Sequence, residues 1–354
     1  MSFLHPIFIF VRKMRFLLVL TVLCMGAAGC EPLFEAAGDC TPVYRMKFVY
    51  DMNMDHADAF ASKVPSVELY AFEAGSGRLV RVFSESGAAL AQEGYAMTLD
   101  LAPGDYDFVA WCGLADNEGQ FTLPASVPTL ADTRCTLARE RGADGKATQN
   151  RSLHALFHGR SLETLPEDNA EHTYTMPLVK NTNNISLSIQ ETGGKALDPD
   201  RFTIRMVVDN GSMAYDNTVL EDEAIEYLPY RKTSGSAAVG GSRADDGVRQ
   251  DIILAELSTA RLIAGHSPTL DIIDNRTGRT VYAVPLIKWA LMLKSQQYAG
   301  MADQEYLDRE DEFNIILYIS EEDGITPGDP EYYLAVGVVI NGWRMVINGD
   351  TELH

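Results

Sequence analysis

Two stretches of the sequence have residue types and spacing that approach those of metal sites. In the first, Asp51, Asn53 and Asp55 alternate as the first oxygen ligands of a calcium loop do. Such a loop also needs glycine at its sixth position and glutamate at its twelfth. Here His56 and Ser62 occupy those positions. The pattern therefore does not predict a calcium site.

In the second stretch, His154 and His158 are spaced like the zinc-binding histidines of a zincin helix. The glutamate general base of that motif is replaced by Ala155. The acidic run Asp308–Glu312 is interpreted as a solvated helix end, although a carboxylate pair for glycoside hydrolysis stays open. The sequence has no phosphate-binding glycine loop and no G-x-S-x-G motif. We therefore predict a protein that is not an enzyme and that binds no metal or other noncovalent cofactor.

Cys30 is the residue whose surroundings predict a chemical modification. A basic cluster at residues 12–15 precedes an almost unbroken apolar run, Phe16–Ala28, and small residues close the run before the cysteine. This is the three-part layout of a secretory signal. The ending Ala-Ala-Gly-Cys is similar to a bacterial lipobox, although leucine is commoner than Ala27 at its position. We therefore predict a covalent diacylglycerol and palmitate on Cys30.

The prediction divides the N-terminal region into a signal peptide, residues 1–29, and a lipidated tether, residues 30–40. The alternative is an uncleaved anchor built from both apolar runs, which the basic cluster between them disfavours. The apolar run before Cys30 is shorter than the roughly 20 residues that a membrane-spanning helix needs. Loss of the signal takes the formal net charge from −21 to −24. A chain this acidic repels phosphate groups, so we expect no nucleic-acid partner. We expect membrane attachment to come from acyl chains.

Three further cysteines remain in the exported chain: Cys40, Cys112 and Cys135. Export permits a disulfide, and we predict one between Cys40 and Cys112. Cys135 is able to replace either partner, and three buried free thiols are the alternative. A bridge between Cys40 and Cys112 would close a loop of roughly 70 residues and stabilise the fold by about 4 kcal/mol in the chain-entropy model.

Period-two alternation of apolar and polar residues dominates the chain, which is typical of half-buried strands. The clearest runs are Tyr44–Tyr50, Tyr95–Leu101, Ile185–Ile189, Phe202–Met206 and Phe313–Ile319. Turn signals separate them, so the pattern favours β-sandwiches with few helices. Short helices are expected after Pro285 and around Gln304–Arg309, and Ser234–Gly247 is interpreted as an exposed loop. We place a domain boundary near Lys180, between residues 41–180 and 181–354.

The C-terminal segment carries the strongest short-range signal for a hairpin. Asn341-Gly342 separates two apolar-rich runs, and this dipeptide favours a tight turn between strands. The alternating apolar residues of the two predicted strands are Val336, Val338 and Ile340, then Trp343, Met345 and Ile347.

Two stretches of the sequence are long and unusual. They are residues 39–73, DCTPVYRMKFVYDMNMDHADAFASKVPSVELYAFE, and residues 304–319, QEYLDREDEFNIILYI. Shorter supporting stretches are residues 95–114, 213–230 and 255–263. In these stretches the chain resembles the FimB/Mfa-type lipoprotein subunits of type V fimbriae in Bacteroidales, and the resemblance runs from Cys30 to the C-terminus.

The resemblance implies an all-β fold of two transthyretin-like β-sandwich domains in tandem. It also implies a structural subunit that tethers a fimbria to the outer membrane, with major or minor pilins as partners. Subunits of such fibres join by strand exchange, a form of β-augmentation. On this basis the terminal hairpin is the candidate exchange element, able to end assembly at the fibre base.

Two alternatives to an anchor remain at the level of the sequence. One is a surface lipoprotein adhesin, or a tip or accessory subunit, that binds protein or carbohydrate. The other is a hairpin that only completes the C-terminal sandwich of its own chain. The sequence names neither the pilin that the protein joins nor a host ligand.

Overall fold

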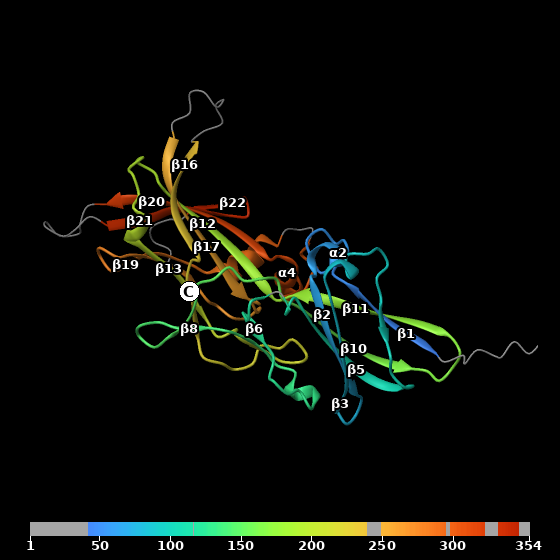
Figure 1. The fold of residues 1–354 in the computed structure, drawn as a ribbon. Helices are drawn as coiled ribbons and strands as arrows, with labels where there is room; N and C mark the ends of the chain where they lie inside the picture. The colour runs from blue at the N-terminus through green and yellow to red at the C-terminus, as the bar shows by residue number, and fades with distance from the viewer. Residues whose placement is uncertain (1–41, 116, 239–248, 295–297, 323–331, 347–354) are drawn as a thin grey trace, which may run out of the picture. The chain divides into compact units, whose positions relative to one another are not determined.

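The structure is a computed structural model that describes residues 42–115, 117–238, 249–294, 298–322 and 332–346. Apart from residue 42 and residues 168–170, the described residues belong to one compact unit. Strands dominate that unit, and its described α-helices are short (Figure 1). The predicted fold class, all-β with two transthyretin-like sandwiches in tandem, is confirmed. No described helix has the length and apolar character to cross a membrane.

The N-terminal sandwich is built from one seven-stranded sheet with the order β3-β2-β5-β10-β11-β1-β4. The strands are β1 (Val43–Val49), β2 (Ser66–Glu73), β3 (Leu79–Ser86), β4 (Met97–Leu99), β5 (Gly104–Cys112), β10 (Phe157–Leu165) and β11 (Glu171–Lys180). The first part of β11 pairs in parallel with β1, and its last three residues pair with β10. Strand β11 therefore joins the two layers that enclose the N-terminal core.

Strand β1 shows why these residues form a strand in this place. Tyr44, Met46 and Phe48 point into the core and are at most 1% exposed, as their alternation predicts. The strand pairs with β11 on one side and with β4 on the other, and Figure 1 shows it beside β11. The first described strand of the chain is thus an internal strand of its sheet.

The C-terminal sandwich consists of two six-stranded sheets that face each other across an apolar core. One sheet has the order β16-β17-β12-β20-β21-β22, with β12 (Thr182–Glu191), β16 (Arg231–Ala238), β17 (Arg249–Ala260), β20 (Glu312–Glu322), β21 (Tyr332–Ile340) and β22 (Trp343–Val346). The other has the order β19-β18-β13-β15-β9-β8, with β8 (Glu140–Arg141), β9 (Ala147–Gln149), β13 (Phe202–Val208), β15 (Ile225–Tyr227), β18 (Leu270–Asp274) and β19 (Arg279–Val284).

The chain crosses between the sandwiches before the predicted boundary at Lys180. Strand β9 pairs in parallel with β15, so the segment at residues 140–149 belongs to a sheet of later strands. A small third sheet joins β6 (Phe121–Thr122), β7 (Cys135–Leu137) and β14 (Ser212–Met213). Pairing across the boundary follows from long-range contacts that sequence periodicity does not report. The division at residue 180 stays a prediction.

Strands β2 and β5 are buried on both faces. Leu69 and Phe108 lie in the N-terminal core, whereas Tyr70 and Trp111 lie in the core that contains the C-terminal strands. Gly113 follows β5 with a φ of 88°, and a Cβ there would lie 2.2 Å from the carbonyl oxygen of Ala155. The backbone is therefore tightly packed at the end of β5, where only glycine fits without a shift.

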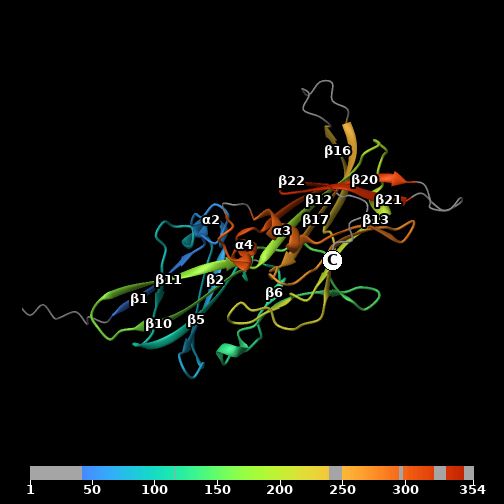
Figure 2. The same ribbon diagram turned by 180° about the vertical axis from the view of Figure 1, so that it is seen from behind.

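The described α-helices are α2 (Phe60–Lys63), α3 (Leu286–Leu293) and α4 (Asp303–Arg309). Helix α3 begins just after Pro285 and α4 covers the second predicted helix, so both sequence expectations are met. The two helices lie side by side, as Figure 2 shows from behind.

The prediction of an exposed loop at Ser234–Gly247 is wrong for the first part of that segment. Ser234 to Ala238 belong to β16 and pair with β17. Small residues disfavour a strand by propensity, but pairing with the Ile-rich β17 overrides that preference. The remaining residues of the predicted loop lie outside the described residues.

Candidate functional site

The cysteines predicted to be modified or bridged lie mostly beyond the described residues, which include neither Cys30 nor Cys40. Cys112 and Cys135 are fully buried, and they are not bonded to each other. Burial raises the pKa of both thiols, so both are protonated at neutral pH. The lipid on Cys30 and the bridge from Cys40 to Cys112 stay predictions.

The terminal hairpin predicted from the sequence is present. Strand β21 pairs antiparallel with β20 and β22, and the register places Ile340 opposite Trp343. Asn341 and Gly342 form the turn with φ values of 45° and 84°. Positive φ at both positions is what a type I′ turn requires, and Asn-Gly satisfies that requirement at low cost. Ile347, the last residue of the predicted set, lies outside the described residues.

The apolar residues of β21 do not all share one face, which corrects the predicted alternation. Val338 and Ile340 are 0% exposed and pack in the core, whereas Val336 is 39% exposed. The register shifts between Tyr318 and Ile319 of β20, which leaves Val336 as an extra residue on β21. A β-bulge of this kind reverses which residues face the core, and the sequence contains no local signal for it.

Both ends of β21 are held by polar contacts. At its start, the Arg201 guanidinium lies 4.2 Å from the ring centroid of Tyr333 and makes a bidentate pair with the fully buried Asp274. At its end, the backbone N–H of Asn314 donates to Asn341 Oδ1 at 2.7 Å, and Asn341 returns a backbone hydrogen bond. These contacts, with the buried residues between them, make β21 an integral strand of its own sandwich.

The structure brings together the two acidic stretches singled out in the sequence. Arg309 donates from Nη1 to the carbonyl oxygens of Asp51 and Asn53, at 2.8 and 3.2 Å. A pocket of about 620 Å³ lies between the stretches, and the ion pair of Lys180 with Asp311 lines it. Burial raises the pKa of Glu310 to about 6. Within the described residues, no three acidic, histidine or cysteine side chains are placed to hold a metal ion.

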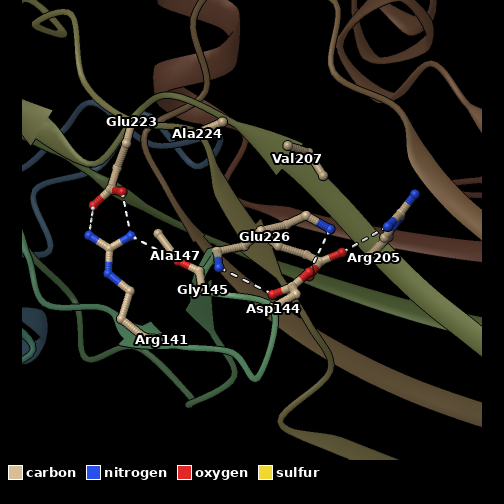
Figure 3. A pocket seen from close by; sticks show the side chains of 10 residues that line it. Arg141, Asp144, Gly145, Ala147, Arg205, Val207, Glu223, Ala224 and Glu226 are labelled. Atoms are coloured by element: carbon tan, nitrogen blue, oxygen red, sulfur yellow. Dashed lines mark hydrogen bonds and ion pairs between the residues drawn. The ribbon is translucent and has the colours of Figure 1, made fainter.

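A second pocket, of about 580 Å³, is lined by charged residues that pair with one another (Figure 3). Arg141 makes a bidentate contact with Glu223, and Arg205 contacts Glu226 at 2.9 Å. Surface ion pairs of this kind contribute little to stability. Because these side chains already have partners, the pocket presents no unpaired charge to a ligand.

A buried polar cluster near the C-terminal end of β5 was not found by sequence reasoning. The Nε2 atom of His158 lies 2.9 Å from the Tyr215 carbonyl oxygen, and its ring packs edge-on against Trp111 at 4.6 Å. Asn181 and Asn217 exchange side-chain hydrogen bonds at 2.6 and 3.0 Å. Scattered histidines and asparagines carry no periodic signal, so only the tertiary structure shows that they meet.

Comparisons with known proteins agree with one another. The sequence matches the family described as fimbrillin-A associated anchor proteins Mfa1 and Mfa2 over residues 37–349. It is 23% identical over 325 residues to the minor fimbrium anchoring subunit Mfa2 of Porphyromonas gingivalis, covering 90% of each chain. The crystal structure of the Mfa2 anchor from the same organism has a TM-score of 0.63 at 19% identity, covering 87% of this chain and 99% of the other.

Two further crystal structures, both from Bacteroides thetaiotaomicron, are similar over the same share of this chain. One, described as an adhesin, is 32% identical with a TM-score of 0.72 over 87% of this chain and 99% of the other. The second, described as polysaccharide-binding, is 27% identical with a TM-score of 0.71 and the same coverage.

Proposed function

Because this chain belongs to the family of fimbrillin-A associated anchor proteins, we propose that it is the lipid-anchored base subunit of a fimbria. In this role the lipid on Cys30 holds the protein in the outer membrane, exposed at the cell surface. The C-terminal hairpin joins a major or minor pilin by β-strand exchange, which ends the fibre at its base.

The internal position of β1 is the observation that carries this proposal. The strand follows the predicted tether directly and pairs on both sides, with three buried side chains in the core. A pull on the tether therefore acts on a strand held by two ladders of hydrogen bonds. The lipid also keeps β1 close to the membrane, which disfavours its release to open an acceptor groove. The C-terminal hairpin is then the donor.

The hairpin can act as a donor strand only if binding to the partner offsets the free energy needed to release the hairpin from its own sheet. Exposing Val338 or Ile340 to water would cost about 1.5–3 kcal/mol for each side chain. A groove that buries the same side chains returns that free energy, and main-chain hydrogen bonds add to it. Strand β22 pairs with Gly337–Ile340 of β21 and lies at the edge of the described sheet. We therefore expect strand exchange to begin at β22.

The first experiment tests the tether. Cys30→Ala should lose palmitate-analogue label and move from the membrane fraction to the medium, because the described part of the chain contains no spanning helix. The matched control is Cys135→Ala, which removes a buried thiol and should leave labelling unchanged. Label retained by Cys30→Ala would rule out the lipid site.

The second experiment tests the joint. Deleting residues 343–354 removes β22 while keeping β21 and its core residues, so the protein should fold and keep its lipid. Cells should then shed their fimbriae, and pilin recovered with the protein should fall at least tenfold. Val207→Ala, at an exposed valine on the other sheet of the C-terminal sandwich, is the control and should leave fibre attachment unchanged. A folded truncated protein that still holds fibres on cells would show that the hairpin is not the joint.

A second candidate function is that of an adhesin or accessory subunit, which the 32% identity to a protein described as an adhesin favours. Carbohydrate recognition commonly uses exposed aromatic rings, but the exposed large apolar side chains among the described residues are all aliphatic. Immunogold labelling of isolated fibres separates the two roles. Labelling at the base supports the anchor, and labelling along the shaft or at the tip supports the adhesin.

A further inference from the structure

The outer face of the sheet that contains the hairpin carries an uncharged band. Alternation directs Ile253, Leu187 and Leu317 into the core, so the residues between them face outward. The strand registers place these outward residues in two rows. One row is Thr233, Leu254, Ser188, Ile316 and Val339, and the other is Gly235, Ile252, Gln190, Tyr318 and Gly337.

On these five strands neither row contains a charged residue, although the chain is 22% charged with a net charge of −21, and the register pairs the last residue of the first row, Val339, with Arg344 of β22. Within the band Thr233 is exposed and Leu254 is 39% exposed, whereas Ile252 is only 7% exposed. Leu334 and Val336 of β21 add 44% and 39% exposed side chains beside the band. Antiparallel sheets usually present polar residues on the face that contacts water. A contiguous uncharged face of this kind is typical of the core of a protein interface.

The edge strand next to the band provides an independent observation. Proteins protect sheet edges with short strands, bulges or charges. Strands β4, β8 and β22 are short, and β3 and β19 each carry an extra residue that breaks the register, Val80 and Val281. Among the described edges, β16 runs over eight residues in unbroken register with β17, and no charge occurs from Thr233 to Ala238.

We propose that this uncharged band, from β16 to the hairpin, is the docking face for the neighbouring fimbrial subunit. The proposal rests on the proposed anchor role, because the band ends at the hairpin that would hold that subunit. A pilin joined at β22 lies beside Val339, at the hairpin end of the first row. Its contacts with the band extend the joint at β22 into one continuous interface. The partner is a subunit that presents an uncharged β-face and that can pair a strand with β16.

A second copy of this chain is the competing occupant. Two mature chains, each with the net charge of −24 that remains after loss of the signal, repel each other over their whole surfaces. This repulsion disfavours self-association at the band and leaves the pilin that the hairpin would hold as the occupant.

The experiment places a charge in the band of the full-length lipidated protein on cells. Leu254→Arg and Thr233→Arg each introduce a charge at an exposed position, so folding should be preserved, as judged by protease resistance. The matched control is Val207→Arg, at a 44% exposed valine on the outer face of the other sheet. Each band variant should lower the amount of cell-attached fimbriae about tenfold, and the control should match the wild type.

A photo-crosslinking residue at position 254 identifies the occupant directly, with position 207 as its control. A crosslink to a pilin that appears only at position 254 supports the proposal. A crosslink to a second copy of the chain overturns it, as do band variants that attach fibres normally while the 343–354 deletion sheds them. If the deletion also leaves attachment intact, the hairpin is not the joint, and the docking face that extends from it fails as well, whereas the anchor role is tested separately by immunogold labelling at the fibre base.

Discussion

His158 is a buried imidazole that the fold keeps neutral. It is 4% exposed, and loss of hydration lowers its pKa to about 4. The hydrogen bond to the Tyr215 carbonyl oxygen opposes this shift, while the positive charges of Arg261 and Arg160 add to it. Because a carbonyl oxygen only accepts, the neutral ring carries its proton on Nε2. The Nε2–H group donates to the Tyr215 carbonyl oxygen in either protonation state, so it is burial and not this hydrogen bond that keeps the ring neutral.

The first prediction at this scale is a loss of stability in mild acid. Between pH 6.5 and 4 the unfolded chain binds a proton at His158 that the folded chain does not, so the free energy of unfolding falls as the pH falls. The depressed pKa sets an upper contribution of roughly 3 kcal/mol at pH 4. Urea unfolding of wild type and His158→Gln at pH 7 and pH 4.5 should show a smaller loss in the variant. Equal losses in both proteins would contradict the assignment.

Strand β21 illustrates how one extra residue changes the role of an element. Before the bulge Tyr333 faces the core, and after it Val338 and Ile340 do, so the strand is anchored along its whole length. The exposed Val336 and Leu334 then lie on the outer face beside the uncharged band. The bulge therefore lets one strand contribute both to its own core and to a surface.

The bulge predicts unequal effects of truncating two apolar residues that are four positions apart. Ile340→Ala should destabilise the protein by about 2–5 kcal/mol, because it leaves a cavity in a packed core. Val336→Ala should change the free energy of unfolding by less than about 0.5 kcal/mol, as exposed substitutions usually do. Chemical denaturation of both variants measures the difference, and similar losses would place Val336 in the core.

At the scale of the whole molecule, the two sandwiches share strands β2 and β5 through their opposite faces. Tyr70, Phe72, Val109 and Trp111 belong to the core that includes the C-terminal strands, while the alternate residues belong to the N-terminal core. Segment 140–149 adds β8 and β9 to a sheet of later strands. The two apolar cores are therefore linked through shared strands, and the packing is continuous across the compact unit.

This continuity predicts that the compact unit unfolds in one cooperative transition. Trp111→Ala removes a fully buried side chain and should lower the stability by about 3–5 kcal/mol. The whole denaturation curve should shift, with circular dichroism and tryptophan fluorescence remaining coincident. Met292→Ala, at a 65% exposed side chain, is the control and should leave the curve in place. Two separate transitions in the wild-type protein would contradict a shared core.

The sequence by itself determined the features that local chemistry encodes. Alternation predicted which side of β1 is buried, and Asn341-Gly342 predicted the terminal turn, because period and φ preference act over a few residues. The lipid on Cys30 is read from the same kind of local pattern and stays a prediction.

Only the tertiary structure decided the features that depend on partners far apart in the chain. These are the bulge at Val336, the two-sided burial of β2 and β5, the pairing of β9 with β15, and the uncharged band across five strands. Each depends on which strands become neighbours. A strand's own residues state which side chains favour burial but not which neighbouring strand will cover them.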